Sequence, residues 1–152
     1  MKHLSGKSYN YKKFNPAVDK KNLMLLSGLI WSGIGLFLLS LAYRWLLNFD
    51  DIIIYYLGGF LLAFFIHSFG FKKIAQKNIN RILNMKTNKI CLFAFQPWKS
   101  YAIIVIMMSL GNYLRNSSIP KNYLAIIYFG IGGALFLSSL IYYKKYFKLI
   151  PQ

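Results

Sequence analysis

Four apolar stretches, separated by polar and mostly basic segments, organise this chain of 152 residues. A helix of roughly 20 apolar residues is long enough to cross a hydrocarbon layer of about 30 Å. The pattern therefore predicts an all-α integral membrane bundle of four transmembrane helices. These helices are predicted over residues 23–47, 52–71, 100–117 and 121–143.

The third predicted helix is the shortest, and its start has two interpretations. Its clean apolar run from Ser100 to Leu114 is only 15 residues long and follows Pro97 and Lys99. The helix either begins after Pro97, which a first turn accepts without losing a hydrogen bond, or includes residues 91–95 and is kinked at that proline. The second interpretation buries Lys99 at a cost of at least about 2.5 kcal/mol, which favours the first.

The connections between the helices differ in length and character. The turn over residues 48–51 is so short that the first two helices must form an antiparallel hairpin. Residues 72–99 mix apolar residues with cations and asparagines, which predicts an interfacial helix with its apolar side on the lipid. Residues 1–22 and 144–152 are predicted to be basic tails. The cations predicted to contact anionic lipid headgroups are Lys72, Lys73, Lys77 and Arg81.

The positive charges predict the orientation of the chain. Of its 19 Lys and Arg residues, six precede the first apolar stretch, seven lie between the second and the third, and three follow the fourth. Only Arg44, Arg115 and Lys121 belong to the other two connections. Because cytoplasmic segments are enriched in Lys and Arg, both termini and the 72–99 connection are predicted to be cytoplasmic. Lys far outnumbers Arg, and Asn and Ile are abundant, which indicates an AT-rich prokaryotic genome and hence a prokaryotic plasma (inner) membrane.

Composition argues against several classes of function. An apolar content of 57% is too high for an ordinary soluble domain, and the net charge of +16 flanks the spans, so we expect a lipid bilayer and no nucleic acid as partner. Cys91 is the only cysteine, which excludes an intramolecular disulfide or a cysteine-cluster metal site. The carboxylates are limited to Asp19 and the adjacent Asp50 and Asp51, which do not readily flank one substrate as an acid–base pair. We therefore expect no enzyme, no cofactor and no metal.

Small residues recur at helical spacing in three of the predicted helices, so each of these helices has one small-residue face. Small side chains let helix backbones approach closely in lipid. The faces serve packing inside the bundle or, alternatively, a contact in a homo-oligomer. Their members are Gly28, Ser32 and Gly35 in the first helix, Gly59 and Ala63 in the second, and Gly130, Ala134 and Ser138 in the fourth.

His67 is the first functional candidate. It shares the small-residue face of the second helix, and an ionisable side chain inside a membrane is a functional candidate by default. A hydrogen bond to a backbone carbonyl, to Ser68 or to water would give it a structural role instead. Both roles are compatible with the sequence.

Asn112, Arg44 and Arg115 are further candidates toward the other side of the membrane. Asn112 lies on a polar edge of the third helix, and the two arginines lie near the non-cytoplasmic ends of their helices. Together with Asp50 and Asp51 they could form a polar vestibule. The structural interpretation is interhelical hydrogen bonding by Asn112 and an exposed ion pair of Arg44 with one of the two aspartates.

Part of the sequence resembles a family of small bacterial multi-pass membrane proteins whose function is uncharacterised. The resemblance rests on CLFAFQPWKSY at residues 91–101, on SIPKNYLA at residues 118–125 and on the stretch from Ile131 to Leu140. It implies no specific activity.

These observations favour a small accessory or scaffold protein, which acts through helix–helix contacts with another membrane protein and through anionic lipid. The alternative is a subunit of a small oligomeric transporter, flippase or channel. Ion-coupled carriers usually place a carboxylate inside a span, and no predicted span of this chain contains one.

The predicted orientation places Cys91 on the cytoplasmic side, and this residue reports on it because it is the only thiol. We expect a membrane-impermeant maleimide to label Cys91 in lysed cells and not in intact cells. Equal labelling in the two samples would contradict the orientation.

Overall fold

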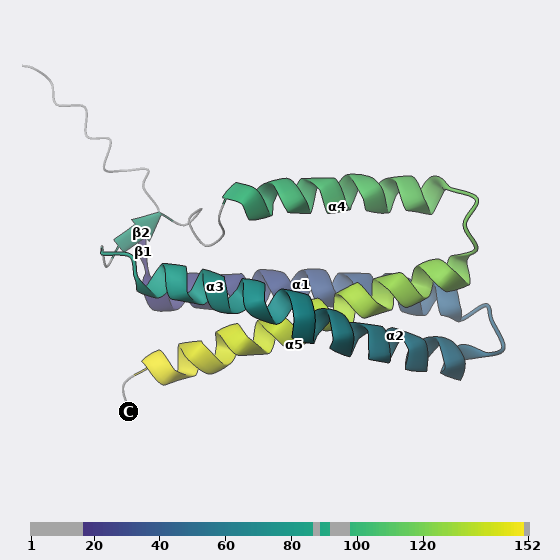
Figure 1. The fold of residues 1–152 in the computed structure, drawn as a ribbon, viewed down its shortest axis with the longest axis horizontal. Helices are drawn as coiled ribbons and strands as arrows, with labels where there is room; N and C mark the ends of the chain where they lie inside the picture. The colour runs from purple at the N-terminus through teal and green to yellow at the C-terminus, as the bar shows by residue number, and fades with distance from the viewer. Residues whose placement is uncertain (1–16, 87–88, 92–97, 151–152) are drawn as a thin grey trace, which may run out of the picture.

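The computed structural model describes residues 17–86, 89–91 and 98–150 (Figure 1). The described residues are helical except for one short two-stranded ribbon and the turns between elements. Its first half contains β1 (Ala17–Asp19), α1 (Lys20–Leu46), α2 (Ile52–Ile66), the π-helical turn η2 (His67–Phe71) and α3 (Lys72–Leu83). Its second half contains β2 (Lys89–Cys91), α4 (Trp98–Asn116) and α5 (Lys121–Leu149). The predicted all-α class is confirmed.

Three helices are long and apolar enough to cross a membrane. They are α1, the continuous helix Ile52–Leu83 formed by α2, η2 and α3, and α5. The predicted membrane character is confirmed to this extent. Among the described helices, α4 does not reach this level, because Lys99, Asn112 and Arg115 dilute its apolar residues. The described part of this helix begins at Trp98, and residues 92–97, on which the two predicted starts differ, lie outside the described residues.

All three long helices extend past their predicted apolar stretches at the basic side. α1 begins at Lys20 and α5 continues to Leu149, so the predicted tails are partly helical. Lysine is a good helix former, and no glycine or proline interrupts these extensions. A continuous helix of 32 residues is roughly 48 Å long, whereas the hydrocarbon layer is about 30 Å thick. The helices therefore project well beyond that layer.

α1 and α5 cross in close backbone contact. A Cβ atom added to Gly35 would lie 2.8 Å from the carbonyl oxygen of Gly132, and one added to Gly132 would lie 2.8 Å from the carbonyl oxygen of Gly35. Real Cβ atoms essentially never approach an atom so closely, so both positions need glycine. Gly35 belongs to the predicted small-residue face, whereas Gly132 was not recognised.

Two hydrophobic clusters fill the space on either side of this crossing. The first cluster joins α1, α3 and α5, and the second joins the other ends of α1 and α5. The crossing thus fixes the distance between the helices, and the clusters fix their angle. The first cluster contains Leu23, Met24, Trp31, Ala75, Ile79, Ile82 and Tyr142. The second contains Ala42, Leu46, Leu124, Ala125 and Tyr128.

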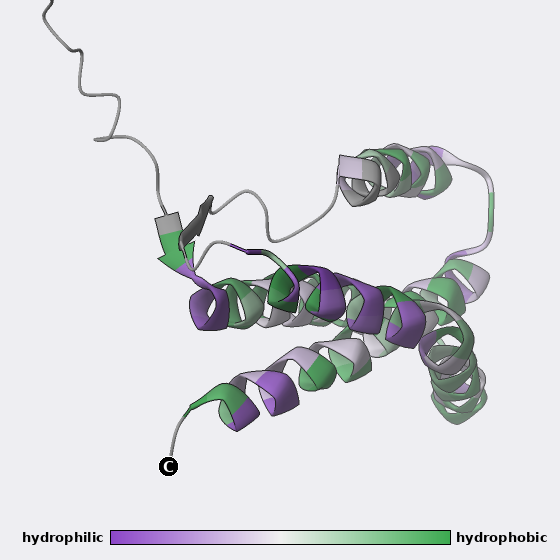
Figure 2. Ribbon diagram, turned by 60° about the vertical axis from the view of Figure 1, so that its left-hand side comes forward, coloured by the Kyte–Doolittle hydropathy of each residue, from purple (hydrophilic) through white to green (hydrophobic). Residues whose placement is uncertain are grey.

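α2 packs on the opposite side of α5 through a second set of small residues. A Cβ atom at Gly59 would lie 2.6 Å from the Phe129 ring, and one at Gly130 would lie 2.7 Å from Leu62. α5 consequently lies between α1 and α2, and both helices of the predicted hairpin pack mainly against α5. The helix is mostly hydrophobic (Figure 2), and its large apolar side chains away from α5 are exposed. They include Ile53, Ile54, Leu57, Phe60, Leu61, Phe64 and Phe65.

The apolar side of α3 faces the bundle, not lipid as predicted. Ala75, Ile79 and Ile82 are buried in the first cluster. The prediction was wrong here because α3 continues the line of α2 and so stays against α1 and α5. Lys20 fixes this arrangement, since its Nζ donates to the carbonyl oxygens of Leu83 (3.1 Å) and Met85 just beyond the end of α3.

A short antiparallel ribbon adjoins the start of α1. β1 pairs with β2, so residues 17–19 of the predicted tail and residues 89–91 of the predicted interfacial segment lie side by side (Figure 1). No alternating pattern of polar and apolar residues around these two segments is long enough to predict this pairing. The register places Ala17 opposite Cys91, Val18 opposite Ile90 and Asp19 opposite Lys89.

The crossing of α1 and α5 generates a stability prediction with an internal control. We expect Gly35→Ala to lower the free energy of unfolding by about 1–3 kcal/mol, because the new methyl group must push α5 away. At Gly33 an added Cβ meets nothing within 4 Å. Gly33→Ala should therefore leave stability unchanged or raise it by up to about 1 kcal/mol. Thermal unfolding of both variants in the same detergent checks this; equal midpoints would contradict the assigned contact.

Candidate functional site

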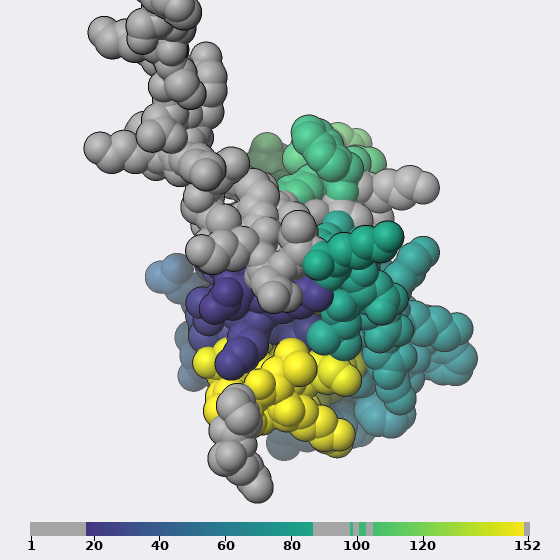
Figure 3. All heavy atoms as spheres, turned by 90° about the vertical axis from the view of Figure 1, so that its left-hand side faces the viewer, coloured from purple at the N-terminus to yellow at the C-terminus, as the bar shows by residue number. Residues whose placement is uncertain are grey.

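Several polar side chains lie inside the bundle toward its basic end, which we define as residues 17–21, 72–86 and 144–149. Figure 3 views the molecule from this end, where α1, α3 and α5 meet. The site has three parts. The first part is the contact of His67 in η2 with α5, and the second is the contact of Tyr142 in α5 with α3. The third is a lysine-lined groove between α3 and α5.

His67 is the first residue of η2 and contacts the small-residue face of α5. Its Nδ1 atom lies 2.8 Å from Oγ of the fully buried Ser138. Two residues predicted separately, as a functional candidate and as a packing residue, are thus brought together. The π-helical turn coincides with this contact, and such turns occur frequently at functional sites. Phe71 at the end of η2 packs edge-on against Trp31 of α1, with ring centroids 5.7 Å apart.

Tyr142 carries the second polar contact. Its hydroxyl oxygen accepts a hydrogen bond from Nδ2 of the buried Asn78 (3.1 Å). Arg81 donates to Oδ1 of the same asparagine through Nε (3.4 Å) and Nη2 (3.2 Å). Arg81 was predicted to contact lipid, but the structure holds its guanidinium against Asn78. Asn78 lies one helical turn before Arg81, whereas Tyr142, which fixes the position of Asn78, is 64 residues away, and no local pattern records that second contact.

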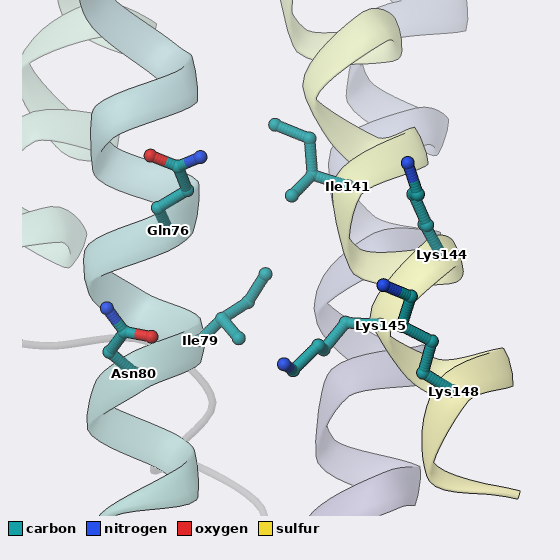
Figure 4. Close-up of a pocket in the computed structure, with 7 residues that line it drawn as sticks. All are labelled: Gln76, Ile79, Asn80, Ile141, Lys144, Lys145 and Lys148. Carbon is teal, nitrogen blue, oxygen red and sulfur yellow. The ribbon is translucent and has the colours of Figure 1, made fainter.

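A groove with a volume of about 340 Å³ forms the third part of the site (Figure 4). It lies between α3 and the last turns of α5. Residues 141, 144, 145 and 148 share one face of α5, which explains why three lysines reach one groove. This face was not predicted, because the fourth helix was expected to end at residue 143, before the three lysines. The groove is lined by Gln76, Ile79, Asn80, Ile141, Lys144, Lys145 and Lys148.

The remaining predicted lipid contacts lie outside the groove. Lys72, Lys73 and Lys77 are exposed on α3. They are accessible to headgroups or water.

At the opposite end of the bundle, the predicted vestibule is not assembled. No ion pair joins Arg44 to Asp50 or Asp51, although the structure describes all three. Arg115 Nε donates to the carbonyl oxygen of Gly111 on its own helix (3.3 Å). Asn112 is exposed on α4. The predicted ion pair is therefore wrong, because these side chains point into open surroundings.

The predicted small residues lie at contacts within the chain. A Cβ atom at Gly28 would lie 3.1 Å from the Tyr143 ring, and the Ser32 hydroxyl lies 2.9 Å from that of Tyr143. The Ala63 Cβ would lie 2.9 Å from a Cβ added to Gly133. Ala134 and Ser138 are fully buried. These small residues pack α1 and α2 against α5.

The described residues offer binding groups and few catalytic ones. No group of three or more His, Cys, Asp or Glu side chains among them is arranged to hold a metal ion. The polar contacts inside the bundle use hydroxyl, amide, imidazole and guanidinium groups. Such groups can orient an anion or connect helices by hydrogen bonds.

Comparison with known proteins adds no relative: no family model, curated protein or solved structure matches this chain. The resemblance to small bacterial membrane proteins stays a prediction.

The His67–Ser138 contact gives a test of a structural role for the histidine. His67→Gln retains a hydrogen-bonding group and should change the unfolding midpoint little. His67→Leu leaves the buried Ser138 hydroxyl without this partner and should cost about 1–2 kcal/mol. The double variant His67→Leu/Ser138→Ala should recover part of that loss, because the unpaired hydroxyl is removed.

A functional role for His67 would give a different pattern. For each variant, the abundance of the folded protein and its ability to complement a deletion strain are both measured and compared. A His67→Gln variant that accumulates normally but fails to complement would contradict the structural role, because glutamine does not titrate.

Proposed function

We propose that this chain is a small multi-pass accessory or scaffold protein of a prokaryotic plasma membrane. In this proposal α4 is a fourth span, both termini are cytoplasmic, and α4 pairs with a transmembrane helix of another membrane protein. The basic end adds contacts with anionic lipid headgroups. The observation that carries the proposal is the isolated position of α4.

α4 is attached to the three-helix core near one end only. Tyr128 donates a hydrogen bond from its hydroxyl to the carbonyl oxygen of Gly111 (3.0 Å), and Leu114 packs against the second cluster. The rest of the helix stands apart from α1, α2 and α5 (Figures 1 and 2). Ile106 is 64% exposed and Met108 is 70% exposed. A helix in this position has most of its surface free for a partner.

The character of α4 favours a protein partner over lipid alone. Asn112 has no hydrogen-bond partner within the described part of the chain. A polar side chain in a membrane is stabilised by a hydrogen bond across helices. Exposed Met107 and Met108 provide a flexible surface that adapts to a partner. A helix too polar to be a strong span by itself gains stability from such pairing.

A subunit of a transporter, flippase or channel is the second candidate, and the His67–Ser138 contact is the observation that favours it. A π-helical turn and a histidine inside the bundle could serve proton or substrate movement. Against it, the three acidic residues of the chain all lie outside the helices. The accessory function needs no intramembrane carboxylate.

Site-directed cross-linking tests the partner on α4. In a Cys91→Ser background, Met108→Cys places a thiol on the exposed side of α4, and Leu57→Cys places a matched thiol on the 62% exposed side of α2. In native membranes we expect a benzophenone attached to each thiol through a maleimide, and then photoactivated, to give one discrete adduct from α4 and none from α2. Adding Asn112→Leu should reduce the adduct roughly three- to tenfold.

The mass of the adduct decides the outcome. An adduct whose mass differs from twice that of the chain supports a different membrane protein as partner. A product of twice the chain mass would replace the proposed partner by a second copy. Absence of an α4 adduct, or equal adducts at both thiols, would contradict the proposal.

A further inference from the structure

The groove between α3 and α5 gathers three lysines, and no acidic side chain is among the residues that line it. Lys144, Lys145 and Lys148 reach it from one face of α5. Neither α3 nor α5 contains an acidic residue. Like charges at these spacings repel one another. An anion in the groove would relieve this repulsion for all three ammonium groups at once.

The groove also has an apolar floor. Ile79 is almost completely buried, and Ile141 extends toward it across the gap between the helices (Figure 4). Gln76 and Asn80 add amide groups that can donate hydrogen bonds to oxygen atoms. A ligand that combines phosphate oxygens with an apolar portion matches this lining better than a simple inorganic ion.

The depth of the groove in a membrane favours a lipid headgroup. If a span of about 20 residues starts at Ile52, the hydrocarbon layer ends near Phe71, and Gln76 and Asn80 lie roughly 8 and 14 Å beyond it. The same count from Lys121 ends near Leu140 and places Lys144 roughly 6 Å beyond the layer. Lipid phosphates and the adjoining water occupy this depth. The long helical extensions therefore bring the groove to the level of phosphate groups.

We propose that the groove is a binding site for the phosphate of one anionic phospholipid, with the three lysines around the phosphate and the isoleucine floor against the adjoining glycerol. The site differs from the diffuse attraction expected of exposed cations, because it is saturable and depends on shape. The inference rests on the membrane location in the proposed function but not on the α4 partner. If no partner is found on α4, the proposed lipid site is unaffected, and if the lipid site fails, the proposed α4 partner is unaffected.

Lipid titration of the purified, delipidated full chain tests the site. We use phosphatidylglycerol and phosphatidylcholine as probes in the same detergent and count bound lipids by native mass spectrometry. The groove variant carries Lys144→Gln, Lys145→Gln and Lys148→Gln. The matched control carries Lys72→Gln, Lys73→Gln and Lys77→Gln, which removes the same charge from residues that do not line the groove.

We expect the original chain to bind one phosphatidylglycerol saturably and phosphatidylcholine much more weakly. The groove variant should lose affinity for phosphatidylglycerol on the order of a hundredfold, as the removal of three cations near a phosphate predicts. The control variant should change by less than about threefold, because exposed charges are screened by salt. Equal losses in the two variants would overturn the site in favour of diffuse attraction.

A second variant tests shape without changing charge. Ile141→Trp adds bulk to the groove floor and retains all three lysines. This variant should bind phosphatidylglycerol less tightly at the saturable site. A thermal unfolding midpoint close to that of the original chain is the control that the bundle is folded. Unchanged binding in a folded Ile141→Trp variant would overturn the role of the groove.

Competition distinguishes the sources of the phosphate and the class of the ligand. Inorganic phosphate and glycerol phosphate should fail to displace the bound lipid at matched concentration, because they lack the acyl portion that holds the lipid at this depth. Displacement by either would overturn the lipid assignment and indicate a soluble phosphate ligand. Displacement by an acidic peptide at matched charge concentration would indicate a protein ligand and would also overturn the proposal.

Discussion

The close approach of Gly35 and Gly132 is the contact on which the rest of the bundle depends. With each glycine at the carbonyl oxygen of the other, α1 and α5 cross so closely that neither position has room for a Cβ atom. Lipid tails are as apolar as leucine, so helices in a membrane gain little from burying hydrocarbon and rely on such packing. The crossing then leaves two diverging ends, and each is filled by one hydrophobic cluster.

The position of α5 follows from its glycines and small residues on two sides. Gly132 faces α1, whereas Gly130 and Gly133 face α2. A bulky residue at any of these positions would separate α5 from one neighbour. The last helix in the chain is thus the central one, and the first two helices are held together mainly through it. The lipid-facing surface of α2 is left with large aliphatic and aromatic side chains.

The long basic extensions turn a membrane bundle into a structure with a defined surface outside the hydrocarbon layer. α3 stays attached to α1 and α5 because Ala75, Ile79 and Ile82 continue the core beyond the spans. Lys20 bridges the start of α1 to the end of α3. As α3 and α5 separate there, their side chains form a lysine-lined groove instead of a closed core. The same physical feature, helices longer than the hydrocarbon is thick, therefore underlies both the anchoring of α3 and the proposed lipid site.

Sequence alone determined the all-α class, the three helices long and apolar enough to cross a membrane and the small-residue faces, because these depend on local hydropathy and helical spacing. Only the tertiary structure decided which faces meet. It paired His67 with Ser138 and Asn78 with Tyr142, held the half-buried Arg81 against Asn78, and left Arg44 without its predicted ion pair. It also detached most of α4 from the core. The His67–Ser138 and Asn78–Tyr142 contacts join residues more than 60 positions apart, and no local pattern records such contacts.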